Sequence, residues 1–303
     1  MPVFAVIDTG TNSVKFHIGE RRPDGTWRTL VDRAEVTRLG EGLSETGAIA
    51  PAAIERTVAA IAGMADEAAR HGATALAAVG TMGMRAASNS EAFIAVVRER
   101  TGVTIEVISG AEEGRLAYLA VKAGLGLREG SLCIFDTGGG STQFTFGHGT
   151  TVDDQYSLNI GAVRLTGQHG LGGAISREQL QSALDSIAAE FSRLDGVPSP
   201  DALVGMGGAI TNMTAVMHGL TTYDPDVVQG SILTRAEVDR QLELYRARDI
   251  EGRRRIAGLQ PKRADVILAG ACVVRTVMGK LGRDALTVSD RGLRHGLLVD
   301  RFG

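Results

Sequence analysis

The sequence predicts an α/β protein made of two related domains, each with a mixed sheet flanked by helices. Three observations support this fold class. Strand-like and helix-like segments alternate along the chain, one hairpin motif occurs twice, and 44% hydrophobic with 22% charged residues is a globular composition. A chain of 303 residues also fits two domains.

The spacing of apolar residues distinguishes the individual elements. Runs rich in apolar and β-branched residues predict strands at 3–8, 13–19, 75–79, 104–108, 131–136, 143–147 and 202–204. Apolar residues three or four positions apart predict helices at 51–71, 90–100, 112–123, 177–194, 235–246 and 263–278. The glycine-rich segment 123–130 (AGLGLREG) is the candidate hinge, which places the domains at 1–122 and 123–303. We expect the last helix, 290–303, to pack back on the first domain.

The repeated motif is the most informative feature. Residues 4–19 (FAVIDTGTNSVKFHIG) resemble residues 132–147 (LCIFDTGGGSTQFTFG), and both are typical of a strand, an acidic glycine-rich turn and a second strand. The identical pairs are Asp8/Asp136, Thr9/Thr137, Gly10/Gly138, Ser13/Ser141, Phe16/Phe144 and Gly19/Gly147. The match predicts a duplicated β-hairpin, and with it two similar domains that face each other across a cleft.

The two turns have a composition suited to phosphate. Glycines let the backbone approach oxygen atoms closely, and N–H groups and hydroxyls bind anions. The residues expected to bind phosphoryl oxygens are Thr11, Asn12 and Ser13 in the first turn and Gly138, Gly139, Gly140 and Ser141 in the second. An acid at the start of each turn suits a divalent metal or an oriented water, so Asp8 and Asp136 are candidate ligands. The alternative is a tight hairpin that needs glycine for geometry alone.

A repeated Asp-Thr-Gly also occurs in bilobal aspartic proteases, where it places two carboxylates. Those proteins are nearly all-β, whereas this chain has several helical segments. The protease interpretation is therefore rejected.

A third glycine cluster lies at 205–213 (GMGGAITNM), between an apolar run and a helical segment. Backbone amides at a helix N-terminus bind anions, so Gly207 and Gly208 are candidate phosphate contacts. The cluster is not a dinucleotide fingerprint, and tight packing of helix on strand is the alternative.

The segment 107–121 (VISGAEEGRLAYLAV) carries two adjacent acids with different expected roles. Ser109 fits a helix N-cap and Glu112 the third helical position, so a capping box explains Glu112. Glu113 is not needed for the cap and is a candidate general base for an attacking water. The alternative is that it only stabilises the helix dipole, as acidic residues in the first turn of a helix commonly do.

Seven of the eighteen residues at 246–263 (RARDIEGRRRIAGLQPKR) are Lys or Arg. A basic ridge would suit a polyanionic substrate, whereas a solvated helix face is the usual explanation. Arg85 and Arg164, in other glycine-containing turns, are candidates for bidentate contacts to oxygen.

Net charge and cysteine content exclude several classes of protein. A net charge of −3 gives no field that attracts nucleic acid or an anionic membrane, and no run is long enough for a membrane span. Cys133 and Cys272 lie in apolar runs and are expected to be core residues in a cytoplasmic protein.

Several segments together resemble the exopolyphosphatase/guanosine pentaphosphate phosphohydrolase family of the actin-like ATPase superfamily. They are IDTGTNSVKF, GTMGMRAASNSEAF, VISGAEEGRLAYLAV, FDTGGGSTQF, NIGAVRLT, GMGGAI, RADVILAGA and TVSDRGLRHGLL. The resemblance implies two actin-like (ribonuclease H-like) domains, an interdomain cleft and Mg²⁺-dependent release of terminal phosphate from a phosphate chain. It also implies a homodimer.

The resemblance assigns roles to particular residues. Glu113 matches the glutamate that activates water, and Asp136 and Asp8 match the acids of the two turns. Residues that match phosphate contacts are Asn12, Arg85, Gly138, Gly139, Ser141, Gly207 and Arg263. Gln143 stands where the family usually has Glu, and an amide is a weaker ligand for Mg²⁺. Met82 and Gly83 replace the small, hydroxyl-bearing residues expected before Arg85.

The leading hypothesis is an exopolyphosphatase acting on inorganic polyphosphate with Mg²⁺ as cofactor. Removal of the 5′ γ-phosphate from guanosine pentaphosphate is the alternative within the family. An ATP-dependent kinase and a weakly catalytic sensor of polyphosphate or alarmone are the further candidates, the second suggested by Gln143.

Overall fold

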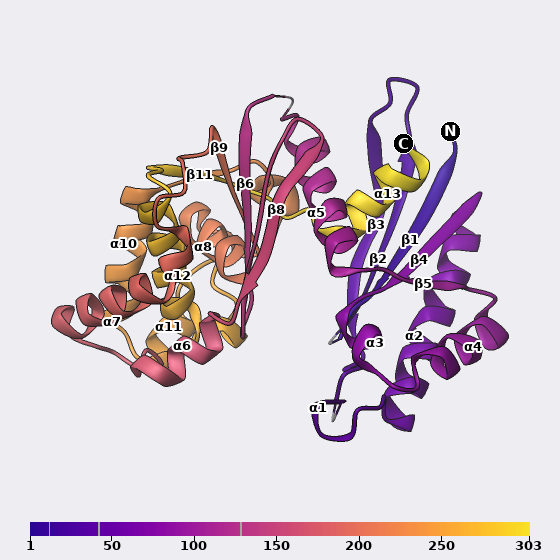
Figure 1. Ribbon diagram of the computed structural model, residues 1–303, viewed down its shortest axis with the longest axis horizontal. Helices are drawn as coiled ribbons and strands as arrows, with labels where there is room; N and C mark the ends of the chain where they lie inside the picture. The colour runs from indigo at the N-terminus through magenta and orange to yellow at the C-terminus, as the bar shows by residue number, and fades with distance from the viewer. Residues whose placement is uncertain (12, 42, 128) are drawn as a thin grey trace. The chain divides into compact units, whose positions relative to one another are not determined.

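A computed structural model describes residues 1–11, 13–41, 43–127 and 129–303 (Figure 1). The chain divides into two compact units, one formed by Met1–Ala123 with Arg291–Gly303 and the other by Gly124–Asp290. Each unit contains one mixed sheet with helices packed against it, so the predicted α/β fold with mixed sheets is confirmed.

The first unit has a five-stranded sheet in the order β3-β2-β1-β4-β5. The strands are β1 (Val3–Thr9), β2 (Ser13–Arg21), β3 (Trp27–Val36), β4 (Ala75–Gly80) and β5 (Ile105–Val107). The helices are α1 (Leu43–Thr46), α2 (Pro51–Arg70), α3 (Met82–Ala86), α4 (Ser90–Thr101), α5 (Gly110–Leu125) and α13 (Leu293–Phe302). β1, β4 and β5 run parallel, and β2 and β3 extend the sheet as an antiparallel meander.

The side chains of β1 point alternately to the two faces of the sheet, and this explains the layers of the first unit. Ala5 and Ile7 belong to the core beneath α2 and α4, whereas Val6, between them, belongs to a second core with Leu116 of α5 and Leu297 of α13. Successive strand residues point to opposite faces, so a strand that is apolar at every position is covered on both sides. The C-terminal helix α13 therefore completes the first unit (Figure 1).

The second unit repeats this plan around a six-stranded sheet in the order β10-β11-β9-β6-β7-β8. The strands are β6 (Ser131–Thr137), β7 (Thr142–His148), β8 (Thr151–Leu158), β9 (Ala202–Met206), β10 (Ile232–Thr234) and β11 (Ala285–Val288). The helices are α6 (Ala162–His169), α7 (Arg177–Glu190), α8 (Gly208–His218), α9 (Pro225–Val228), α10 (Arg235–Arg246), α11 (Ile250–Arg254) and α12 (Ile267–Lys280). Two 3-10 turns are η1 (Ser192–Leu194) and η2 (Pro261–Arg263).

The duplication read from the sequence extends to backbone detail. The hairpins β1–β2 and β6–β7 share one register, with Asp8 opposite Lys15 and Asp136 opposite Gln143. The second strand of each hairpin pairs with a third strand through a register shift, at Ile18/Gly19 in one unit and Phe146/Gly147 in the other. These are equivalent positions of the repeat, so the two meanders bend at the same place.

Some predicted elements differ from the structure. β3 and β8 were not predicted, because both are largely exposed strands whose apolar alternation is weak. The helix predicted at 263–278 begins at Ile267, after the turn η2, and the helix at 177–194 ends at Glu190 before η1. None of the helices formed by the described residues is both long and apolar enough to cross a membrane.

Candidate functional site

In the first unit, the functional candidates gather at the carboxyl ends of the parallel strands. Asp8 lies near the end of β1, Arg85 follows β4 on the short helix α3, and Glu113 follows β5 in the first turn of α5. The carboxyl ends of parallel strands share one edge of a sheet, and ligands of open α/β sheets bind there. The sequence suggested that Arg85 lies in a turn, but it lies on a helix, because the short helix α3 begins directly after Thr81.

Glu113 is held by Arg85. The guanidinium Nη2 donates to Glu113 Oε2 at 3.2 Å, and Nη1 donates to the carbonyl of Ile108 at 2.7 Å. Burial raises the pKa of Glu113 above its ordinary value, the bond from Arg85 opposes that rise, and the negative charge of Asp8 adds to it. A carboxyl whose pKa is raised is a better proton acceptor, as a general base requires.

The predicted capping box at Glu112, the neighbouring acid, forms only in part. Ser109 Oγ accepts from the Glu112 amide at 3.1 Å, which caps α5. The Glu112 carboxylate is bound at both oxygens by Arg115 rather than returning to the cap, and this bond lowers its pKa. Two adjacent acids thus have pKa values shifted in opposite directions by their surroundings.

Asp8 has a partner that the sequence reasoning missed. Lys15 Nζ lies 3.4 Å from Asp8 Oδ2, directly across the hairpin, and the Asp8 side chain is almost fully buried. The positive charge of Lys15 also acts on Glu113. The signal for Lys15 was present in the repeat, because it occupies the position that corresponds to Gln143.

The first turn is closely packed against its surroundings. The Gly10 amide donates to the Ser13 carbonyl at 3.0 Å, and the Thr11 carbonyl accepts from the Gly40 amide at 2.7 Å. A Cβ atom added at Gly83 would lie 2.9 Å from Thr11 Oγ1, so glycine at this position lets α3 approach the turn. Asn12, also a predicted phosphate contact, lies outside the described residues.

The second turn has the same hydrogen bond, from the Gly138 amide to the Ser141 carbonyl at 2.8 Å. Its carbonyls at Gly138 and Gly139 accept from the first amides of α6. The amides of Gly139, Gly140 and Ser141 have no acceptor in the described part of the chain. The turn is therefore fixed through its carbonyls, while three consecutive amides remain available to an anion.

Asp136 lies against the glycine cluster that begins α8. Gly207 has a φ of +93°, and a Cβ atom there would lie 2.4 Å from Asp136 Oδ1. A Cβ atom at Gly208 would lie 2.6 Å from Arg263 Nη2. Asp136, both glycines and Arg263 thus converge at the N-terminus of α8, whose first amides have no acceptor within the helix. Gln143 is exposed on β7 opposite Asp136.

The basic segment at 246–263 does not form one ridge, because its members have different environments. Arg253 is completely buried and donates to the carbonyls of Leu171, Gly173 and Tyr245, while Arg246 pairs with Glu243. Arg164 is also bound, to the Asn159 carbonyl and Glu190. From this segment, Arg263 contacts the glycine cluster.

Comparison with known proteins decides the family. The model of the Ppx/GppA phosphatase family matches residues 20–303. The chain belongs to the Ppx/GppA phosphatase family. Exopolyphosphatase 2 of Mycobacterium tuberculosis is 30% identical over 99% of this chain and 98% of its own length. Exopolyphosphatase 1 of Mycobacterium leprae is 27% identical over 98% of this chain and 87% of its own.

Structural similarity agrees with this assignment. A crystal structure of the Aquifex aeolicus Ppx/GppA phosphatase has a TM-score of 0.93 and 32% identity, and the match covers 100% of both chains. The chain is thus a hydrolase with the two-sheet fold of the Ppx/GppA family, as the resemblance implied.

Proposed function

We propose that this Ppx/GppA protein is an exopolyphosphatase that hydrolyses terminal phosphate from inorganic polyphosphate, with Mg²⁺ as cofactor. The observation that carries the proposal is the arrangement around Glu113. A carboxyl with a raised pKa, oriented by Arg85, lies in the electrostatic reach of Asp8 and Lys15 at the edge where β1, β4 and β5 end. Relatives named exopolyphosphatase that match nearly the full chain support the substrate class.

Glu113 is the proposed general base. A water attacks the terminal phosphorus, Glu113 takes its proton, and the bond to the bridging oxygen breaks with its electron pair on the shortened chain. The products are inorganic phosphate and a chain one unit shorter. Positioning and electrostatic stabilisation supply most of the rate in such reactions.

The remaining predicted residues are proposed to bind the substrate. Amides of Gly139, Gly140 and Ser141 would donate to phosphoryl oxygens, joined by Thr11 and Ser13 of the first turn. Arg85, Arg263 and the amides at Gly207 and Gly208 would provide further contacts. Three open amides in the second turn and a guanidinium beside a helix N-terminus are donors suited to a polyanion.

The donor set fits Mg²⁺. This ion is usually bound through one or two carboxylates together with substrate phosphates and water, so a complete cage of side chains is not required. Asp8 in the first unit and Asp136 in the second are each proposed as a carboxylate ligand, with the amide oxygen of Gln143 as a weaker one. When bound, Mg²⁺ would neutralise charge on the phosphate chain. Lys15, whose Nζ lies 3.4 Å from Asp8 Oδ2, would hold that carboxylate in place.

The test is phosphate release with Mg²⁺ from polyphosphates of graded length and, in parallel, from guanosine pentaphosphate. We expect release from polyphosphate with the higher kcat/KM. A higher kcat/KM for the nucleotide would replace the proposed substrate with the family's alternative. Tight binding of polyphosphate without turnover would identify a sensor instead.

A further inference from the structure

The loop that follows β3 contains an arginine with an unusual backbone conformation. Among the described residues, Arg38 is the only one other than glycine with a positive φ, which is +51°. Residues with a Cβ atom seldom adopt this left-handed conformation, and they keep it where the surrounding structure imposes it. Such residues are concentrated at ligand-binding and active sites, so the contacts around Arg38 bear on function.

Contacts on both sides of Arg38 hold this conformation. Arg56 of α2 donates from Nε to the Thr37 carbonyl at 3.0 Å and from Nη2 to Glu41 Oε2 at 2.7 Å. The Glu41 amide donates to the Arg38 carbonyl at 3.0 Å, and Leu39 is completely buried in the core beneath α2 and α4. Because Glu41 pairs with Arg56, the guanidinium of Arg38 forms no ion pair or hydrogen bond with any described residue. The loop therefore presents this positive charge on a fixed backbone.

The same loop lies against the first turn. The Gly40 amide donates to the Thr11 carbonyl at 2.7 Å, and a Cβ atom at Gly40 would lie 2.2 Å from Thr11 Cγ2. α3 contacts the same threonine through Gly83, two residues before Arg85. β3 leads to Arg38 and β4 leads to Arg85, and the hairpin β1–β2 lies between these two strands in the sheet. Two arginines therefore flank the first turn, one on each side.

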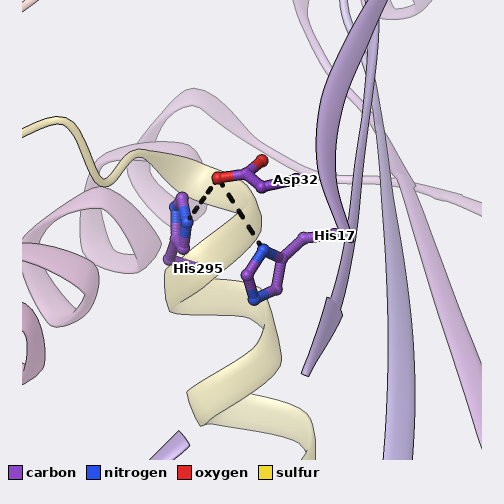
Figure 2. A group of neighbouring side chains, drawn as sticks. All are labelled: His17, Asp32 and His295. Atoms are coloured by element: carbon purple, nitrogen blue, oxygen red, sulfur yellow. Dashed lines mark hydrogen bonds and ion pairs between the residues drawn. The ribbon is translucent and has the colours of Figure 1, made fainter. Parts of the chain in front are cut away.

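Arg38 and the acid of the first turn lie on the same side of the sheet. The side chain of Arg38 is exposed, whereas its two neighbours in the chain are buried, so it points away from the core beneath α2 and α4. Figure 2 identifies the opposite face, because it shows His17 of β2 directed toward Asp32 and α13. Lys15 precedes His17 by two residues and pairs with Asp8, so both project from this face. A ligand bound along the first turn on this face can therefore reach Arg38.

We propose that Arg38 binds a phosphate of the polyphosphate chain several units away from the one that is removed. This role rests on the proposed function, in which Glu113 and Arg85 mark the reacting end. Arg85 donates to Glu113 and to the Ile108 carbonyl, both on the β5 side, and so points away from Arg38. β3 and β4 are three strand spacings apart, roughly 14 Å, so one phosphate does not contact both arginines but a chain spans them.

The properties of Arg38 suit a phosphate chain. A guanidinium offers two parallel donors to a phosphate, and it stays charged at any ordinary pH. A left-handed backbone held by Arg56 orients Arg38 before the chain arrives, which reduces the entropy lost on binding. Arg38 is therefore a binding residue for long chains, and its contribution lies in KM rather than in kcat.

Arg38→Asn tests this role, because asparagine tolerates the left-handed conformation while the guanidinium is lost. We expect KM for long-chain polyphosphate to rise about tenfold, as for the loss of a charged hydrogen bond, with kcat and thermal unfolding little changed. KM for tripolyphosphate should stay the same, because a short chain held at Glu113 does not reach Arg38. Arg38→Lys should restore part of the affinity through its charge. Arg70→Asn, at the exposed end of α2 that precedes β4 and so at the opposite edge of the sheet, is the matched control and should change neither KM.

Binding is measured separately from turnover, by titration calorimetry with long-chain polyphosphate and Mg²⁺ on Glu113→Gln with and without Arg38→Asn. A Kd about tenfold higher in the double variant supports the role of Arg38 even where the wild type releases no phosphate, a result that would reject only the proposed function. Equal Kd values, no binding by Glu113→Gln, or an equal rise of KM for tripolyphosphate would overturn the role of Arg38. A rise in Arg70→Asn as large as in Arg38→Asn would do the same, because it would show a general effect of charge.

Discussion

The two turns share a backbone but differ in the groups that surround them. In the first unit, Asp8 faces Lys15, and Glu113 with Arg85 lies close by. In the second, Asp136 faces the uncharged Gln143 and lies against Gly207, with Arg263 next to Gly208. Ionisable side chains dominate the first turn, whereas backbone amides and one guanidinium dominate the second.

This difference teaches how a duplicated hairpin can be specialised. The hydrogen bond that closes each turn, the pairing register and the position of the bulge are the same in both units. Those features depend on backbone geometry, which glycine and the strand pattern determine. The side chains near each turn differ between the units: Lys15 of β2, Arg85 of α3 and Glu113 of α5 in the first, and Gln143 of β7 and Arg263 of η2 in the second. Under the proposed function, a common scaffold would carry acid–base chemistry in one copy and anion binding in the other.

The largest expected effect comes from removing the proposed base of the first turn. Glu113→Gln should lower kcat for phosphate release by about 10²- to 10⁴-fold, the range for general acid–base catalysis. The amide keeps the size of the side chain and a hydrogen-bond acceptor for Arg85, so thermal unfolding should change little. Glu112→Gln is the control, because its partner is the structural Arg115. Retained activity in Glu113→Gln would assign the chemistry elsewhere.

Gly207→Ala tests the second turn through its backbone. The φ of +93° is strained for alanine, and the new methyl group would lie within 2.4 Å of Asp136 Oδ1. We expect a loss of stability of about 1–3 kcal/mol together with a fall in activity. Gly167→Ala, in open space on α6, should be neutral or slightly stabilising. Calorimetry and phosphate release on both variants separate strain at Gly207 from a general sensitivity to alanine; equal stability of the two would contradict the close packing at Asp136.

Arg85 should control the pH dependence of the first turn. Glu113 acts when deprotonated, so activity should rise as the pH passes upward through its pKa. The bond from Arg85 lowers that pKa against the opposing effect of burial. Arg85→Gln should therefore move the acidic limb of the kcat profile to higher pH, and Arg85→Lys should restore part of the shift through its charge. An acidic limb that stays in place in Arg85→Gln would show that another group titrates there.

Sequence patterns were sufficient for the parts of the site that are local. The repeat located both turns, and the strand–glycine–helix pattern located Gly207. Ser109 caps α5 as predicted, but the Glu112 side chain binds Arg115 and does not complete the predicted capping box. Contacts between segments distant in the sequence could not be predicted from it. Arg294 binds Asp32 across 262 positions, and Arg253 satisfies carbonyls about 80 positions earlier in the chain, although its sequence context suggested a surface ridge. A run of charged residues shows only the local composition of the chain. Whether one of its side chains is buried depends on which element packs over it.

The smallest effect is expected at the position where the two hairpins differ most directly. Gln143→Glu restores the acid usual in the family opposite Asp136, and a carboxylate is a stronger ligand for Mg²⁺ than an amide. We expect the Mg²⁺ concentration for half-maximal activity to fall a few-fold, with a smaller change in kcat. Gln155→Glu, on the neighbouring strand β8 and opposite Thr145, adds the same charge and is the control. If both variants lower the half-maximal Mg²⁺ concentration equally, a general increase in negative charge is responsible. If only Gln143→Glu does, the amide opposite Asp136 weakens metal binding in this chain, and the second turn retains its anion-binding amides while giving up part of its metal site.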